Sequence, residues 1–447
     1  MTAAYPGGSK LPEHQELDEG AKVELPATPS ATEALGETQI VPRGPGTNRE
    51  IAPPTADLFQ DPESEVALSA PQIPLVKPSP PVPAVVDVNK LDWVALRGSI
   101  DTAGIRSRMA STILQMENLL NQTAGAGMLF DSDRSCSADK AIQVPHVGNN
   151  DAVWFIGDLH GDLLALETAL LLIRGHVQQG AGKSRIIFLG DLFDDEGFGL
   201  EVLLRVFEII LEDPSLICIL AGNHDEALGH DGTRFVSSVS PSDFSEFLNN
   251  HLSDEWIARA GKLAIRFFHS APRALFFRDG LLVAHGGFPL TDLHPQLLES
   301  GDWNDPTCLS DFVWTRAHPT ARKKIPNRFS RGSQFGFEDF TAFCSLASDL
   351  GRPVTHMVRG HDHVEQRFAI YPAYGAHPVL TTVALSRRLS REFLGPYERA
   401  PTAALYVEGS LPQVFRLHVP SDLIRSVYPE PLDSDDSHIE SIHGGVE

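Results

Sequence analysis

Residues 153–162 read Val-Trp-Phe-Ile-Gly-Asp-Leu-His-Gly-Asp, an apolar run that ends in side chains able to bind a ligand. The four apolar residues are two aromatic and two β-branched side chains, which predicts a strand buried on both faces. Gly157 lets the chain turn as it leaves the sheet, so Asp158 and His160 are expected together at the carboxyl end of the strand, where ligands usually bind in open α/β sheets. Asp162 can cap the helix that follows. Because an isolated Asp-x-His segment is more often a helix cap beside a surface histidine, the rest of the chain decides the interpretation.

Four later stretches repeat this arrangement, since each places polar side chains and glycine directly after an apolar run. They are Gly190-Asp191-Leu192-Phe193-Asp194, Gly222-Asn223-His224-Asp225, His285-Gly286-Gly287 and Gly360-His361-Asp362-His363. Any one of them could arise by chance. Five in succession at strand ends indicate one site built from several strands.

Apolar runs and helical patterns alternate along the central part of the chain. Strands are predicted at 185–189, 216–220, 281–284, 354–358 and 379–384, and a helix at 199–211. This alternation predicts a layered α/β fold. Residues 225–279 are predicted to be helical and residues 291–348 to be rich in loops, and both would cover one rim of the sheet.

The chain divides into four parts by composition. Residues 1–90 are rich in Pro, Glu, Ser, Thr and Ala, which predicts a disordered arm because they cannot bury enough apolar surface to offset their ordering entropy. Residues 91–150 are predicted to form a helical brace and a linker, since apolar side chains from Ile105 to Leu120 recur at helical spacing. Residues 151–420 would form the central domain. Residues 421–447 would form an acidic, disordered tail.

The composition also limits the partners and the compartment. The formal net charge of -23 argues against nonspecific nucleic-acid binding, because a polyanion must meet clustered Lys and Arg. The four cysteines are far apart and form no C-x-x-C pair, so neither a disulfide framework nor a thiolate zinc site is indicated. No signal peptide is recognisable, and no apolar run is long enough to cross a bilayer. We therefore expect an acidic cytoplasmic protein without a membrane segment.

The side chains at the strand ends favour two divalent metal ions. Carboxylate, amide oxygen and imidazole suit Mn, Fe or Zn, and the absence of Cys from these motifs disfavours iron–sulfur and thiolate zinc sites. A carboxylate can bridge two ions about 3.5–4 Å apart, which can activate a shared hydroxide and hold the oxygens of an in-line displacement at phosphorus. The sequence therefore predicts a phosphoester hydrolase.

The motifs GD-x-HG, GD-x-x-D, GNHD, HGG and RGH, which lie between residues 151 and 385, closely resemble those of the calcineurin-like metallophosphoesterases. Two further segments are similar to the phosphoprotein phosphatase branch of that family: Asp311-Phe312-Val313-Trp314 and Arg331-Gly332-Ser333-Gln334-Phe335-Gly336. The resemblance implies a metallophosphoesterase-type β-sandwich flanked by helices. It also implies hydrolysis of phosphomonoesters by a hydroxide that bridges two metal ions.

The resemblance further implies a role for each residue of the site. Six residues would bind the metals: Asp158 and His160 the first, Asp191 both, and Asn223, His285 and His361 the second. His224, backed by Asp194, would be the general acid that protonates the leaving oxygen, because a carboxylate beside an imidazole keeps it charged. Arg331 would hold the phosphate through a bidentate fork.

Two features near these motifs differ from the phosphoprotein phosphatase branch. Where that branch continues Asp-Arg-Gly, this chain has Asp194-Asp195-Glu196-Gly197, so one phosphate-binding arginine is missing. Arg322, Lys323, Lys324 and Arg328 could replace it or could form a solvated basic loop. His363 matches a second histidine of the wider family that binds the first metal, whereas the branch usually lacks it, so both interpretations of His363 stay open.

Three functions fit this sequence. The first is a dinuclear-metal phosphatase of phosphorylated proteins, because Trp314 and Arg331 match that branch. The second is a hydrolase of nucleotides, dinucleoside polyphosphates or other small phosphoesters, which GNHD in place of GNHE and the missing arginine both favour. The third, a catalytically weak scaffold, is disfavoured because all six expected ligands and His224 are present.

Overall fold

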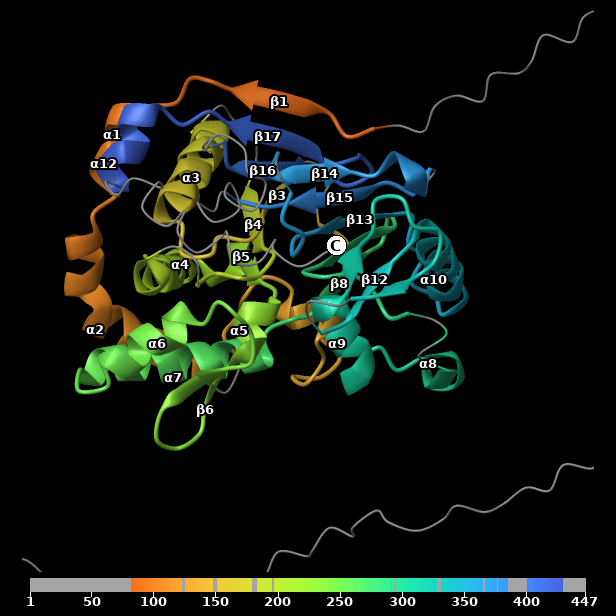
Figure 1. Ribbon diagram of the computed structural model, residues 1–447, viewed down its shortest axis with the longest axis horizontal. Coiled ribbons are helices and arrows are strands. Elements are labelled where there is room, and N and C mark those ends of the chain that lie inside the picture. Colours follow the sequence, from red (N-terminus) through yellow and green to blue (C-terminus); the bar gives the residue numbers. More distant parts are fainter. Residues whose placement is uncertain are drawn as a thin grey trace, which may run out of the picture. The chain divides into compact units, whose positions relative to one another are not determined.

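Two six-stranded sheets and the helices outside them form the part of the chain that positions the site (Figure 1). The computed structural model describes residues 82–122, 125–147, 151–178, 183–194, 197–290, 292, 295–327, 331–364, 366–375, 377–384 and 400–428. The predicted disorder of residues 1–81 therefore concerns residues outside the described ranges.

The first sheet contains the strand predicted at residues 153–156. Its strands, in spatial order, are β1 (Val85–Val88), β17 (Gln413–Leu417), β16 (Thr402–Tyr406), β3 (Ala152–Ile156), β4 (Ser184–Phe188) and β5 (Ile217–Ile219). β3, β4 and β5 are parallel, so their carboxyl ends meet at one edge, and every residue of β3 is buried. The prediction of a strand buried on both faces is thus confirmed.

The second sheet delivers the later motifs. Its strands, in spatial order, are β14 (Phe368–Ile370), β15 (Val379–Thr382), β13 (His356–Arg359), β9 (Leu281–Ala284), β8 (Ala274–Phe277) and β2 (Ala141–Val144). β9 and β13 pair in parallel, with Val283 opposite Val358, so the residues that follow these two strands emerge side by side.

The two sheets pack on each other through their apolar faces. Phe155 and Ile187 of the first sheet belong to the same buried cluster as Val283 and Val358 of the second. Fully burying side chains of this size contributes roughly 1.5–3 kcal/mol each. This central layer confirms the β-sandwich and holds the two motif-bearing edges together.

Helices cover the outer faces of both sheets. The cluster outside the first sheet includes residues of α2 (Thr102–Leu120), α3 (Leu163–Gln178), α4 (Gly199–Glu212), α6 (Asp243–Asn250) and α7 (Glu255–Ser270). The cluster outside the second sheet includes residues of α8 (Pro295–Ser300), α9 (Pro306–Trp314) and α10 (Phe337–Asp349). The described chain therefore has the predicted layered α/β architecture.

The helical brace predicted before the central domain is also present. α1 (Trp93–Ser99) and α2 follow one another, and Ile105, Ile113 and Met116 form the buried face of α2. α2 packs against α4 and α7, and Glu117 of α2 forms an ion pair with Arg259 of α7 at 2.5 Å.

Two predictions about the covering segments are wrong in part. Residues 225–279 contain α5 (Asn223–Ala227), α6 and α7, but also β8 and a hairpin of β6 (Leu228–His230) and β7 (Phe235–Ser237). Residues 291–348 are not mainly loops, because α8, α9 and α10 lie there with β10 (Arg316–Ala317), β11 (Ile325–Pro326) and β12 (Ser333–Phe335). The start of α9 had a recognisable signal, since Asp305 caps it by accepting a hydrogen bond from Thr307 N.

The predicted boundaries of the two flanks need correction. Val85–Val88, placed in the disordered arm, pairs as β1 with β17, and Asp87 forms ion pairs with Arg416 and His418 at 2.7 Å. At the other end α12 (Ser421–Val427) occupies the start of the predicted tail, and Tyr428 is buried after it. These short segments are ordered by tertiary contacts: β1 pairs with the edge of β17, and Leu423 and Tyr428 pack in an apolar cluster with Leu164. The remaining tail, residues 429–447, lies outside the described residues.

Two truncations test where the arm ends. Deleting residues 1–81 is expected to leave the melting temperature nearly unchanged, whereas deleting residues 1–89 removes β1 and should lower it, because the edge of β17 loses its partner. Thermal denaturation of the two variants beside the full chain measures the difference. Equal melting temperatures for the two truncations would show that β1 contributes no stability.

Candidate metal centre

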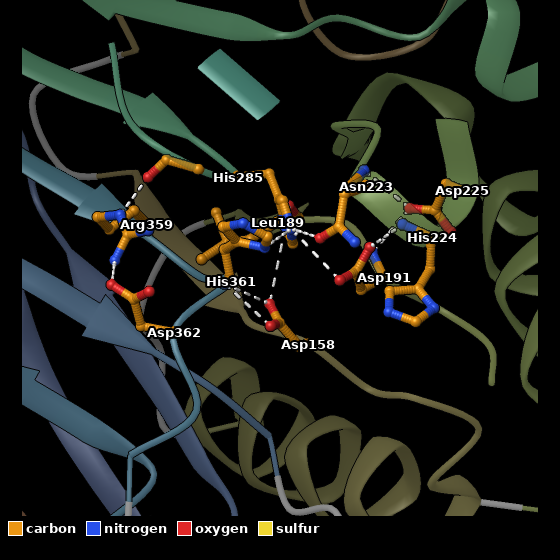
Figure 2. Close-up of polar contacts among 12 residues, drawn as sticks. Asp158, Leu189, Asp191, Asn223, His224, Asp225, His285, Arg359, His361 and Asp362 are labelled. Atoms are coloured by element: carbon orange, nitrogen blue, oxygen red, sulfur yellow. Dashed lines mark hydrogen bonds and ion pairs between the residues drawn. The ribbon is translucent and has the colours of Figure 1, made fainter. Parts of the chain in front are cut away.

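Predicted metal ligands that follow strands of both sheets converge on one place, as Figure 2 shows for Asp158, Asp191, Asn223, His285 and His361. Three overlapping groups have ligand atoms within 4.8 Å of one another: Asp158, His160 and His363; His160, Asp191 and His224; and Asp191, His285 and His361. All of these residues except the half-buried His363 are buried. The six predicted metal ligands therefore come together, with Asn223 joining the third group through His285 as described below.

The backbone at these strand ends is bent into the left-handed region. His160, Asp191 and His361 have φ values of 47°, 52° and 68°. Such conformations cost of order 1–3 kcal/mol each in non-glycine residues and cluster at functional sites. The tight turns direct three ligand side chains toward one point.

Two glycines in the motifs allow the close approach of ligand carboxylates. A Cβ atom on Gly222 would lie 2.2 Å from Asp191 Oδ1, and one on Gly360 would lie 2.2 Å from Asp158 Oδ1. A side chain at either position would displace a ligand. This explains why glycine precedes the polar residues in these two motifs.

Three electron-pair donors surround His285 Nε2, which is itself the fourth donor of the group. His285 Nδ1 lies 3.0 Å from Leu189 O, and by donating to that carbonyl it leaves Nε2 with its lone pair. Nε2 then lies 3.1 Å from Asn223 Oδ1 and 3.3 Å from Asp191 Oδ2. His361 Nδ1 is also 3.1 Å from it. In this tautomer a cation is what can satisfy all four atoms at once, so the donor set fits a metal ion.

The charges of the site agree with cation binding. Burial lowers the pKa of His285, but Asp191 and Asp158 outweigh it and raise that pKa above its ordinary value. Burial works against ionisation of Asp191 too, yet His285 and His224 hold the pKa of Asp191 below its usual range. The carboxylates around His285 therefore favour positive charge at this position, which a bound metal ion would supply.

His361 is prepared to bind as a neutral imidazole. Burial and the Arg316 guanidinium lower the pKa of His361 well below its usual value. Its Nε2 is buried and has no hydrogen-bond partner among the described residues. Its backbone N–H donates to Asp158 Oδ1 at 3.1 Å and Oδ2 at 2.9 Å, so the two sheets are joined at the ligands themselves.

His224 and Asp194 form the predicted pair beside the ligand cluster. His224 Nδ1 lies 2.7 Å from Asp194 Oδ2, and Asp194 Oδ1 accepts a hydrogen bond from Phe244 N at 2.8 Å. The backbone N–H of His224 donates to Asp191 Oδ1 at 2.8 Å. The pair is thus fixed to Asp191, a predicted metal ligand, and the second ring nitrogen of His224 can carry a proton.

Asp225 supports this arrangement, although the sequence did not identify its role. Its carboxylate accepts hydrogen bonds from Asp191 N at 2.7 Å, Gly222 N at 2.9 Å and Leu192 N at 3.1 Å. Burial and the nearby Asp191 raise the pKa of Asp225 to about 7. A buried acid directly after Asn-His was the available signal, but the three N–H groups belong to the ends of β4 and β5, which only the fold brings together.

Arg359 and Asp362 brace the loops that follow β9 and β13. Arg359 is fully buried and hydrogen-bonds to Gly286 O and to the Asp362 carboxylate, which also accepts from Ala317 N at 3.0 Å. In the sequence, Arg359 could be recognised only as the first residue of the RGH motif, without a role of its own. Its structural role depends on contacts between distant segments.

Arg331 lies apart from the buried ligands on the exposed surface. Its guanidinium carbon is 5.1 Å from the centre of the Trp314 ring, and Trp314 Nε1 donates to Glu226 Oε2 at 3.3 Å. The two segments that carry the branch resemblance therefore meet as a cation–π pair. Asp195, Glu196 and Arg328 lie outside the described residues.

The other basic residues considered as replacements for the missing arginine lie on the surface. Arg322 pairs with Glu338 and its side chain is 77% exposed, whereas Lys324 pairs with Asp292 at 2.6 Å. For Arg322 and Lys324, these contacts favour the interpretation as a solvated basic loop over a role in phosphate binding.

Known proteins resemble this chain over the same region. Residues 152–365 match the calcineurin-like phosphoesterase family. The serine/threonine-protein phosphatase rdgC of Drosophila melanogaster is 24% identical over 187 residues, which are 37% of this chain and 25% of that protein. The chain thus spans about a quarter of the length of this relative.

The solved structures that match part of this chain include two phosphatases. A serine/threonine phosphatase of Saccharomyces cerevisiae with similarity to human phosphatase PP5 covers 72% of this chain and 91% of its own, at 14% identity and a TM-score of 0.46. A cold-active protein-tyrosine phosphatase of a Shewanella species covers 64% and 84%, at 17% identity and a TM-score of 0.38.

The family match begins at β3 and ends after the Gly360-His361-Asp362-His363 motif, so it includes every predicted metal ligand. The similarity to a serine/threonine phosphatase agrees with the branch that the Trp314 and Arg331 segments indicate. Residues 152–365 therefore match the calcineurin-like phosphoesterase family over the part of the chain that carries the motifs, as the sequence predicted.

Proposed function

We propose that this protein is a metal-dependent hydrolase of phosphomonoesters and that its substrates are phosphorylated proteins. The observation that carries the proposal is the convergence of Asn223, Asp191 and His361 on His285 Nε2, with the His224–Asp194 pair fixed beside them. A site that only binds would not need a buried, carboxylate-backed histidine next to its metal ligands.

The residues divide into two metal positions that share Asp191. Asp158 and His160 would hold the first ion, and Asn223, His285 and His361 the second. When bound, two such ions supply a nucleophile at neutral pH and stabilise the charge that develops on the phosphoryl oxygens. Mn, Fe and Zn all accept these ligands.

The protein's own groups would position the substrate and move the proton. His224, held by its 2.7 Å contact with Asp194, would protonate the leaving oxygen. Arg331, oriented by Trp314, would bind the phosphate from the solvent side. The turns at Asp191 and His361 keep the ligands in place without reorganisation during the reaction.

A small phosphoester is the second candidate substrate. Asp225, the Asp of GNHD, is buried beneath Asp191, and the arginine of the second motif is absent from the sequence. A panel of phosphoserine, phosphothreonine and phosphotyrosine peptides beside nucleotides and dinucleoside polyphosphates separates the two. A phosphopeptide kcat/KM below that of the nucleotides would replace the first candidate by the second.

A cytoplasmic location fits the state of the cysteines. Cys136, Cys218, Cys308 and Cys344 are free thiols, and all but Cys136 are buried. Free thiols persist in a reducing compartment. Among the described residues, none of the helices combines the length and apolarity that a membrane span requires.

His363 is expected to be an additional ligand of the first metal. Its ring centre lies 5.4 Å from that of His160, and both belong to one ligand group with Asp158. His363→Ala should weaken the binding of one Mn²⁺ ion at least about tenfold, as loss of metal-site partners typically does, while saturating metal restores most of kcat. Mn²⁺ titration by isothermal calorimetry measures this. Unchanged affinity for both ions would exclude His363 from the site.

A further inference from the structure

The side chain of Arg316 contacts the loop after β13, which carries His361 and His363. Arg316, in β10, follows Trp314 and Thr315 and reaches the carboxyl end of β13. Its Nη1 donates to His361 O at 2.6 Å and lies 3.5 Å from Asp362 Oδ1. A permanent positive charge is thereby held against a predicted metal ligand.

Arg316 keeps donors available for a ligand. Nη1 is the only guanidinium nitrogen of Arg316 with a hydrogen-bond partner within the described part of the chain, so Nη2 and Nε remain free to donate. The side chain is 25% exposed, in contrast to the fully buried Arg359, which uses its guanidinium to join the loops. A guanidinium that is anchored by one nitrogen and partly open to solvent is suited to fork-like binding of a phosphate dianion.

The neighbouring segments place Arg316 between the metal ligands and the other candidate phosphate contact. β10 pairs in parallel with β12, with Arg316 opposite Gln334, and the turn before β12 carries Arg331. Arg331 lies over the ring of Trp314, two residues before Arg316. Arg316 therefore lies in a strand of the small sheet, and Arg331 lies in the turn that leads into the partner strand β12.

We infer that Arg316 supplies the second guanidinium that binds the substrate phosphate, in place of the arginine missing at position 195. The inference rests on the proposed phosphoesterase function and deepens it, because it makes Arg316 and Arg331 the pair that recognises the phosphate. Arg322 and Lys324 of the basic loop do not fill this role, since each is paired with a surface carboxylate.

Substitution of Arg316 tests its contact with phosphate. Arg316→Gln should raise both KM for a small phosphomonoester and the inhibition constant of inorganic phosphate at least about tenfold, as expected for losing charge-assisted hydrogen bonds. Arg316→Lys keeps the charge but loses the forked guanidinium, so both constants should lie between those of the wild-type protein and of Arg316→Gln. Arg97→Gln, which removes an exposed arginine paired with Asp422 at 2.9 Å, is the matched control and should change neither constant.

A purely bracing role for Arg316 predicts a different pattern. In that case Arg316→Gln would lower the melting temperature and kcat through the His361 loop, while the phosphate inhibition constant stayed at the wild-type value, and this result would overturn the inference. A larger rise of that constant in Arg322→Gln than in Arg316→Gln would also overturn it.

A measurement on the unmodified protein covers the case in which both variants misfold. Phenylglyoxal labels accessible arginines, and inorganic phosphate should suppress labelling of the peptide that contains Arg316 but not of the one that contains Arg97. Equal labelling of Arg316 with and without phosphate would contradict the inference. If the metal-loaded wild-type protein hydrolysed no phosphomonoester at all, the proposed function would fail instead, which the activity assay shows separately.

Discussion

Asp191→Asn is expected to reduce kcat/KM for any phosphomonoester by at least about 10³-fold, equivalent to roughly 4 kcal/mol of transition-state stabilisation. Asp191 Oδ2 faces His285 Nε2 at 3.3 Å, and Asp191 Oδ1 accepts from His224 N at 2.8 Å. Asparagine keeps the size of the side chain but removes the charge that both proposed metal positions would share. Steady-state kinetics at several Mn²⁺ concentrations measure the loss.

Two controls accompany this variant. Asp422→Asn changes an exposed carboxylate in the same way and should leave the kinetics unchanged. The melting temperature of metal-free Asp191→Asn should show a folded protein, because Asp225 still accepts the three backbone N–H groups around the turn. If Asp191→Asn retained wild-type activity at low Mn²⁺, a bridging role for Asp191 would be wrong.

His224→Gln should lower kcat by about 10²–10⁴-fold when the leaving group is a poor one such as an alkyl alcohol, because general acid catalysis is typically worth that much. With p-nitrophenyl phosphate the loss should be much smaller, since that leaving group departs without protonation. Asp194→Asn should likewise lower kcat more for the alkyl ester than for p-nitrophenyl phosphate. The loss should be smaller than for His224→Gln, because this variant weakens the 2.7 Å contact with His224 Nδ1 but keeps the imidazole.

The dependence on the leaving group distinguishes an acid from a structural residue. His251→Gln, an exposed histidine bonded to Phe247 O at 2.8 Å, is the control and should not affect either substrate. Equal losses on both substrates for His224→Gln would show that His224 positions Asp191 or the metals rather than donating a proton.

The convergence of the predicted ligands at one edge could be predicted because its signals in the sequence are local. An apolar run, a glycine and a ligand-type side chain define each strand end, and the pairing of β3 with β4 and of β9 with β13 then follows from ordinary α/β topology. His224 and Asp194 were also predicted as a pair, although only through the family resemblance. The geometry now places them 2.7 Å apart.

The parts that could not be predicted depend on contacts between distant segments. Asp225 acts on three N–H groups from two strand ends, and Arg359 joins the loops after β9 and β13. Arg316 lies in a two-residue strand within a region that was predicted to be rich in loops, and nothing in its local sequence indicates that it reaches His361. Residues 291–348 were misassigned in part because α8 and α9 span only 6 and 9 residues and lie among turns, so periodicity gave little signal there.

The central claim is that catalysis needs metal ions held by the ligands around His285. The most direct test is to strip the protein with a chelator and to follow hydrolysis of a phosphomonoester as Mn²⁺ is returned, with the bound metal quantified in the same samples. Activity should be lost on stripping and should saturate near two ions per chain, as a dinuclear site requires. Full activity in the stripped protein, with bound metal well below one ion per chain, would contradict the account.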